Sequence, residues 1–317
     1  MNEVGVLSPV TSPQGASINP AVLAESLGYE SIWVSQMLGG FDALSVLATY
    51  GTATTRVGLG SFVLPIYGSH PAVLSQAAQT LNVVSAGRFT LGIGVSSPAT
   101  VEGAWGLKFG HRVDAMRDYA TIVQSILRRG RVDYASKYFS AHLTSDIPRT
   151  GHVPLIIAAL NPKMIELAAE IADGVALWMS PPSFIANEVR PRVRRVRERL
   201  GLDPETFRIV VGLPIVLADR ISDALVPLIA KVKTYAARPH YSLGLKSAGW
   251  DSATGHVGEA MIREICGLGD VDDVMAKIGS YRQAGSTEVL LDVWGGESYE
   301  TTLTAVAEGL DRLPKDR

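Results

Sequence analysis

Residues 70–95 read HPAVLSQAAQTLNVVSAGRFTLGIGV, which predicts one helix followed by one strand. His70-Pro71 is typical of a helix start, because proline suits the first helical position. Residues 88–95 form a short, almost entirely apolar run, as expected of a parallel strand that is covered on both faces. The stretch therefore predicts one helix–strand unit of an α/β fold with a parallel sheet.

The same unit recurs along the whole chain. Eight strands are predicted, at residues 3–8, 31–35, 57–64, 88–95, 155–160, 174–179, 208–217 and 287–293. Helices are predicted between and after them, at residues 20–27, 42–53, 71–84, 112–129, 162–172, 183–200, 222–235, 271–284 and 299–313. Gly28, Gly201 and Gly285 stand where three of these helices should end.

Eight strands that alternate with helices, without a break in composition, predict an α/β protein with a single (β/α)8 TIM barrel over residues 1–317. A doubly wound sheet would need a glycine-rich turn after the first strand, and Leu7-Ser8-Pro9 offers none. Two segments, near residues 130–154 and 240–269, are too long for simple loops and are predicted insertions. The second contains Trp250 and His256 and is a candidate lid.

The composition favours a partner that is a small molecule. Of the 317 residues, 47% are hydrophobic and 19% charged, and the net charge of -2 gives no general attraction to nucleic acid or to an anionic membrane. The single cysteine, Cys266, excludes an internal disulfide framework. No apolar run approaches the roughly 20 residues of a membrane span, and the N-terminus lacks the pattern of a secretory signal. We therefore expect a cytoplasmic protein.

The carboxyl ends of the strands indicate where the chemistry lies, because the active site of a TIM barrel forms there. The segments after the first six strands contain no paired carboxylates, no metal-ligand spacing and no nucleophilic triad, so no metal is expected. They are small, apolar and glycine-rich, which suits a flat cofactor ring lying against the backbone. Asn161-Pro162-Lys163 places a helix start and a cation together, which favours either an anion site or an ordinary helix start.

Five segments, in order, resemble the luciferase-like monooxygenase superfamily. They are AESLGYESIWV (24–34), TRVGLG (55–60), SAGRFTLGIG (85–94), PLIIAALNPKM (154–164) and AAEIADG (168–174). The resemblance is nearest to the F420-dependent oxidoreductase branch, which includes proteins like methylenetetrahydromethanopterin reductase and F420-dependent glucose-6-phosphate dehydrogenase. It implies the deazaflavin F420 as cofactor, with FMN as the alternative. It also implies a homodimer, which the apolar composition permits.

The resemblance implies three groups of cofactor-binding residues. The deazaflavin would rest on a bulge after the third strand, with a cis peptide bond between Phe62 and Val63. The groups are Ser61, Phe62, Val63 and Leu64; Gly94, Val95, Ser96 and Ser97; and Ala158, Ala159, Leu160, Asn161, Pro162 and Lys163.

One departure from the family pattern bears on the reaction. Relatives that oxidise alcohols or sugar phosphates carry Asp-His after the second strand, where this chain has Ser35-Gln36, and Ser97 replaces a glutamate that some of them carry. Gln36 can orient an oxygen but cannot take up a proton at neutral pH. With Ser35 and Gln36 as catalytic candidates, we expect hydride transfer to a C=C or C=N bond rather than alcohol oxidation.

Three further residues are candidates for the substrate pocket. Trp178, after the sixth strand, is either a packing residue or a wall of the pocket. Met37 follows the second strand, and His111 begins the long helix after the fourth strand. Two other functions stay open: an FMN-dependent monooxygenase, and a flavin- or deazaflavin-binding protein without catalysis.

Overall fold

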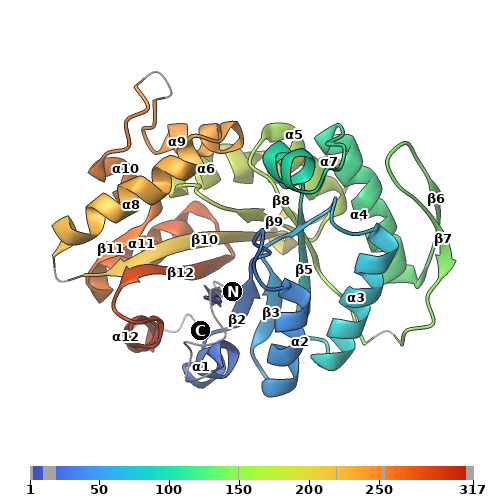
Figure 1. Ribbon diagram of the computed structural model, residues 1–317, viewed down its shortest axis with the longest axis horizontal. Helices are drawn as coiled ribbons and strands as arrows, with labels where there is room; N and C mark the ends of the chain where they lie inside the picture. Colours follow the sequence, from blue (N-terminus) through green and yellow to red (C-terminus); the bar gives the residue numbers. More distant parts are fainter. Residues whose placement is uncertain (1–2, 10–18, 149, 219, 252–253, 312–317) are drawn as a thin grey trace.

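Eight parallel strands of the computed structural model close into a barrel, as predicted (Figure 1). The structure describes residues 3–9, 19–148, 150–218, 220–251 and 254–311. In the described part of the chain, the order around the barrel is β12-β1-β2-β3-β5-β8-β9-β10, and β10 pairs with β12 to close it. The bounds of these strands are β1 (Glu3–Leu7), β2 (Ser31–Val34), β3 (Gly58–Ser61), β5 (Phe89–Gly94), β8 (Leu155–Ala158), β9 (Gly174–Leu177), β10 (Arg208–Leu217) and β12 (Glu288–Gly296).

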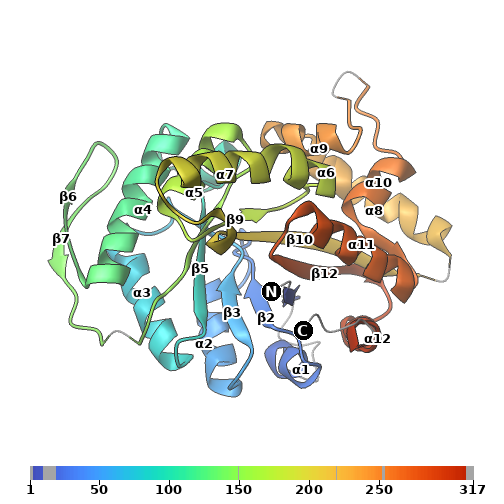
Figure 2. The same cartoon turned by 180° about the vertical axis from the view of Figure 1, so that it is seen from behind.

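Helices surround the barrel, and their apolar faces cover its outer surface (Figures 1 and 2). Their bounds are α1 (Pro20–Ser26), α2 (Ala43–Ala53), α3 (Pro71–Val84), α4 (Arg112–Arg129), α5 (Pro162–Ile171), α6 (Pro182–Phe184), α7 (Arg190–Arg199), α8 (Ile221–Ala236), α9 (Ser242–Ser247), α10 (Glu259–Ile265), α11 (Val271–Ala284) and α12 (Tyr299–Asp311). The predicted helix 183–200 is a continuous run of α6, a π-helical turn η2 (Ile185–Val189) and α7. Within the described residues, no helix is long and apolar enough to cross a membrane.

The two predicted insertions contain secondary structure that the sequence did not indicate. Residues 130–154 carry an antiparallel hairpin, β6 (Arg131–Ala135) and β7 (Ser140–Thr144), which projects beyond α4 at one end of the molecule (Figure 1). Residues 240–269 contain α9, α10 and the strand β11 (Gly267–Gly269), which pairs with β10 outside the closed barrel. Together with α8 they form a second apolar cluster at the other end.

The predicted strand 57–64 is interrupted. β3 ends at Ser61, the peptide bond between Phe62 and Val63 is cis, and a short strand β4 (Leu64–Pro65) pairs with β5 beyond it. The predicted cis bond is thus confirmed. The hydroxyl of Ser61 donates to the carbonyl of Gly92 (3.0 Å) and accepts from its N–H (2.8 Å), so it bridges the two strands where their pairing changes.

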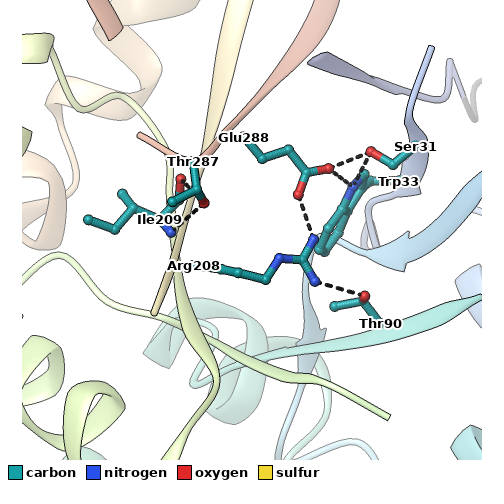
Figure 3. Close-up of polar contacts among 7 residues, drawn as sticks. All are labelled: Ser31, Trp33, Thr90, Arg208, Ile209, Thr287 and Glu288. Atoms are coloured by element: carbon teal, nitrogen blue, oxygen red, sulfur yellow. Dashed lines mark hydrogen bonds and ion pairs between the residues drawn. The ribbon is translucent and has the colours of Figure 1, made fainter. Parts of the chain in front are cut away.

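A polar network closes the N-terminal end of the barrel (Figure 3). Glu288, only 1% exposed, accepts hydrogen bonds from Arg208 (2.6 Å), from the indole of Trp33 (2.9 Å) and from the hydroxyl of Ser31. Arg208 also donates to Thr90 (3.1 Å). Since Ser31, Arg208 and Glu288 are the first residues of their strands, the network ties β2, β10 and β12 together.

Several residues of the family-like segments also lie at this end of the barrel and hold it together. The carboxylate of Glu25 accepts backbone N–H bonds from Thr55 (3.0 Å), Arg56 (2.6 Å) and Val57 (2.9 Å). The guanidinium of Arg88 donates to carbonyls at the end of α2 and before β3: Gly51 (3.0 Å), Thr54 (2.8 Å) and Val57 (2.6 Å). Glu25 and Arg88 therefore stabilise the N-terminal end of the barrel and are not part of its active site.

The Glu25→Gln variant should lose about 1–2 kcal/mol of stability at pH 7. Burial alone would raise the pKa of Glu25, but the bonds from Val57, Arg56 and Thr55 outweigh it and lower the pKa to about 2. Since this value lies below the ordinary one of 4.5, the stabilisation is present above that pH and is lost as the pH falls towards 2. Urea unfolding at pH 7 and pH 3 measures the difference, with the exposed Glu308→Gln as control. An equal loss at both pH values would contradict this account.

Candidate active site

The inward-facing residues in the middle of the barrel form an apolar cluster. Its buried members are Leu7, Trp33, Ile156, Ala176, Val210 and Leu290. Four partly exposed residues pack on this cluster towards the C-terminal end of the strands: Phe62, Val63, Ala158 and Trp178. The barrel mouth therefore has an apolar floor, and Trp178, a candidate for the pocket wall, is part of it.

The interrupted segment after β3 contacts the neighbouring strands closely. A Cβ atom added at Gly94 would lie 2.7 Å from Val63 Cγ2 and 3.3 Å from the Cβ of Ala158, so glycine at this position lets the Val63 side chain lie close against β5. Phe62 packs edge-on against Trp178 at a centroid distance of 6.3 Å. The structure thus brings together predicted residues from after strands three, four, five and six.

The start of α5 lies at the carboxyl end of β8, as predicted. Its N-cap residue Asn161 makes no side-chain cap hydrogen bond, Pro162 occupies the first turn, and Lys163 is exposed. A helix start of this kind, with a cation beside it, is well suited to an anionic group. After β5, Ser96 has a positive φ of 62°, and the hydroxyl of Ser97 accepts the N–H of Thr100 (3.3 Å) in the π-helical turn η1 (Ala99–Ala104).

Other residues predicted for the site make different contacts or are exposed. The hydroxyl of Ser61 is used between β3 and β5, and the side-chain oxygen of Gln36 accepts the N–H of Ala43 (2.9 Å) near the start of α2. Met37 is 61% exposed. The side chain of His111, 65% exposed, pairs with Asp114 on the same helix, so its contact is not with the apolar floor.

An aromatic cluster beside the floor was not foreseen from the sequence. The ring of Trp178 lies 5.8 Å from that of Trp294 on β12 and 5.9 Å from that of Tyr235 on α8. Tyr235 stacks on Trp294 at 6.1 Å and meets Tyr241 edge-on at 5.4 Å. The cluster joins the insertion at residues 240–269 to the barrel mouth, since Tyr241 belongs to that insertion and Tyr235 belongs to α8.

Asp292 on β12 is the second feature that the sequence analysis missed. Its carboxylate accepts a hydrogen bond from the indole N–H of Trp294 (2.5 Å). Burial raises the pKa of Asp292 to about 6, against the lowering effects of that bond and of Lys231. The spacing of Glu288, Leu290 and Asp292, at every second residue of a strand, is the signal that could have placed it inside the barrel.

Two cavities, of about 250 and 230 Å³, lie at the opposite, N-terminal end of the strands. Their linings include strand starts such as Ile209, Ser31 and Gly58. The Arg88 and Arg208 side chains in the second cavity already bind backbone carbonyls and Glu288. Since sites in TIM barrels form at the carboxyl ends of the strands, we place the active site at the mouth.

Comparison with known proteins agrees with this architecture. The sequence profile of the luciferase-like monooxygenase family matches residues 7–288. The chain belongs to this family. A putative coenzyme F420-dependent oxidoreductase of Mycobacterium tuberculosis is 27% identical to it, over 86% of this chain and 89% of that protein. The 5,10-methylenetetrahydromethanopterin reductase of Archaeoglobus fulgidus is 25% identical, over 84% and 86% of the two chains.

A solved structure shares the fold. The coenzyme F420-dependent tetrahydromethanopterin reductase of Methanopyrus kandleri superposes with a TM-score of 0.83 at 22% identity, covering 96% of this chain and 97% of that one. Within this family fold, the mouth of the present chain offers a partly exposed apolar floor and, beside it, an uncapped helix start with Lys163. These features fit a flat ring that carries an anionic tail.

Proposed function

We propose that this chain is an oxidoreductase that uses coenzyme F420 to transfer a hydride to a small organic substrate. The observation that carries the proposal is the apolar floor at the barrel mouth, which includes Phe62 and Val63 and is adjacent to the start of α5. The names of the relatives, two of which are F420-dependent proteins, support the choice of cofactor.

Each group of residues has a distinct part in holding the cofactor. Phe62, Val63 and Ala158 would support one face of the ring, because their partly exposed side chains form the floor. The backbone from Gly94 to Ser97, and Leu160, would border its polar edge. Asn161 and Lys163 would bind the phosphate of the tail through the free helix start and a positive charge. When bound, the deazaflavin supplies or accepts the hydride.

We further propose that the reaction is the reduction of a C=C or C=N bond. Alcohol oxidation needs a base beside the hydroxyl, and the chain has Ser35-Gln36 where such relatives carry Asp-His. The Gln36 oxygen already accepts the Ala43 N–H, which helps to fix the amide, and its NH2 group can donate to a ligand. Gln36 is therefore suited to orienting a substrate, not to removing its proton.

A substrate panel tests the proposed reaction. With reduced F420, enones and cyclic imines should be reduced, followed by the return of the absorbance of the oxidised cofactor. With oxidised F420, secondary alcohols and sugar phosphates should react at least about 100-fold more slowly than the enones and imines react with reduced F420. A missing general base typically lowers the rate 10²–10⁴-fold. Faster oxidation of an alcohol than reduction of any enone or imine would contradict the proposal.

The assembly and location proposed for the enzyme follow from its surface and composition. We propose a homodimer in the cytoplasm that acts on small molecules. Exposed valines on α3, at Val73, Val83 and Val84, support a partner surface of this kind.

A further inference from the structure

Asp292 is distinguished by its position among the barrel strands. In the described residues of the eight barrel strands, the titratable side chains with carboxyl or guanidinium groups are Glu3, Arg208, Glu288 and Asp292. The first three begin their strands, and Arg208 and Glu288 belong to the network at the N-terminal end. Asp292 lies two inward positions beyond Glu288, which places its carboxyl group in the C-terminal half of the barrel.

A chain of ring contacts connects Asp292 to the proposed cofactor floor. The indole of Trp294 donates its N–H to the Asp292 carboxylate, and its ring lies 5.8 Å from that of Trp178. Trp178 in turn lies 6.3 Å from Phe62, the first residue of the cis bond. Asp292 and the floor therefore belong to the same end of the barrel and share one aromatic wall.

We propose that Asp292 is the catalytic acid of the reduction, delivering a proton to the substrate atom next to the one that receives the hydride. This inference rests on the proposed function. When bound, reduced F420 would be the reductant and would supply a hydride, with its two electrons, to one atom of the C=C or C=N bond. The Asp292 carboxyl gives its proton to the other atom and becomes a carboxylate. The product gains two hydrogens, the cofactor is oxidised, and solvent reprotonates Asp292.

The surroundings of Asp292 suit this cycle because some of them stabilise its neutral carboxyl group and others stabilise the carboxylate. Burial favours the neutral carboxyl group and is the main cause of the raised pKa. The Trp294 N–H and the charge of Lys231 on α8 oppose burial and support the carboxylate once it forms. Lys231 lies over the Trp294 ring, 3.8 Å from its centroid, so the indole contacts both charged groups.

The other titratable groups facing Asp292 come from α8, from α12 and from the residue before β11. Most of them are uncharged near neutral pH. Tyr235 on α8, Tyr299 on α12 and Cys266 before β11 all interact electrostatically with it, and burial raises the pKa of each. Lys231 is the cation of this group, and burial lowers its pKa. Asp292 is thus the group in this set that changes charge near pH 6.

Three variants test the assignment by single-turnover oxidation of reduced F420 with an enone or imine substrate. Asp292→Asn should slow hydride transfer by about 10²–10⁴-fold, while the Kd for F420 stays within about twofold of wild type. Asp292→Glu, which keeps the acid, should restore at least a tenth of the rate. Asp133→Asn, on the exposed β6–β7 hairpin, is the matched charge control and should react as wild type does. The wild-type rate should fall as the pH rises through about 6, and the Asn variant should lose this dependence.

A measurement without cofactor checks the same residue. The carboxyl carbon resonance that is lost in Asp292→Asn should titrate near pH 6 in the wild type. Because the folded pKa lies above the ordinary 3.8, the stability that this group contributes is lost as the pH rises through about 6. Relative to wild type, the melting temperature of Asp292→Asn should therefore rise between pH 4 and pH 8. A cooperative melting transition also shows that the variant is folded.

The outcomes separate this assignment from the proposed function. Hydride transfer by Asp292→Asn within threefold of wild type, with the same pH profile, would overturn the role of Asp292 and leave the proposed function standing. A carboxyl titration near pH 4 would do the same. If wild type and Asp133→Asn bind no F420 and transfer no hydride, the proposed function falls, and this assignment falls with it.

Discussion

The Glu288→Ala variant is expected to lose about 3–5 kcal/mol of unfolding free energy. Glu288 is almost fully buried and accepts hydrogen bonds from Arg208, Trp33 and Ser31. Truncating it leaves the guanidinium of Arg208 without its counter-charge, and leaves the Trp33 indole N–H with the Ser31 hydroxyl (2.9 Å) as its remaining acceptor. Unsatisfied buried groups cost more than the net value of the bonds themselves, and three barrel strands lose their common contact.

Urea unfolding followed by circular dichroism measures this loss. Glu308→Ala, at an exposed position of α12, removes the same group without the network and should stay within about 0.5 kcal/mol of wild type. The pair Glu288→Leu with Arg208→Met should be less destabilised than Glu288→Leu alone, because the double change leaves no buried charge. A loss below about 1 kcal/mol for Glu288→Ala would show that the network does not hold the barrel base.

The Gly94→Val variant is expected to weaken F420 binding by about 100-fold, or about 2.8 kcal/mol. The Cβ at this position would lie 2.7 Å from Val63 Cγ2 and 3.3 Å from Ala158, inside the apolar floor. Val63 must then shift, and the added methyl groups occupy space that we assign to the ring. The floor becomes uneven, and a flat ring loses contact with it.

The control is Gly279→Val on α11, where an added Cβ meets nothing within 4 Å. It should bind F420 as wild type does. Overpacking at Gly94 also costs about 1–3 kcal/mol of stability, so the melting temperature of each variant must lie above the assay temperature. Unchanged F420 affinity in folded Gly94→Val would place the cofactor elsewhere.

The barrel was predictable from the sequence because each strand is a local apolar run between helix signals. Residues 88–95 and 208–217 indicate buried strands without any knowledge of their neighbours, and the structure has β5 at Phe89–Gly94 and β10 at Arg208–Leu217. β11 was missed because its three residues, Gly267–Gly269, are too short and too glycine-rich to show a pattern. The β6–β7 hairpin was missed because half of its residues are exposed and polar.

The candidate site was predictable only where family-like segments reach the mouth. The cis bond at Phe62–Val63 followed from resemblance, whereas Glu25 and Arg88, equally prominent in those segments, bind backbone at the N-terminal end. Asp292 could not be found in this way, because its environment depends on Lys231 and Tyr235 of α8, which are distant in sequence. Local pattern places a residue on a strand, but its pKa depends on what packs over it.

Cofactor choice is the central claim, and a titration of the purified protein with F420 and with FMN tests it most directly. Quenching of the intrinsic tryptophan fluorescence reports binding, since Trp178 is part of the proposed floor and Trp294 packs against it. We predict saturable F420 binding in the micromolar range, FMN binding weaker by at least about 100-fold, and loss of the F420 signal in Gly94→Val. Micromolar FMN binding without F420 binding would contradict the account.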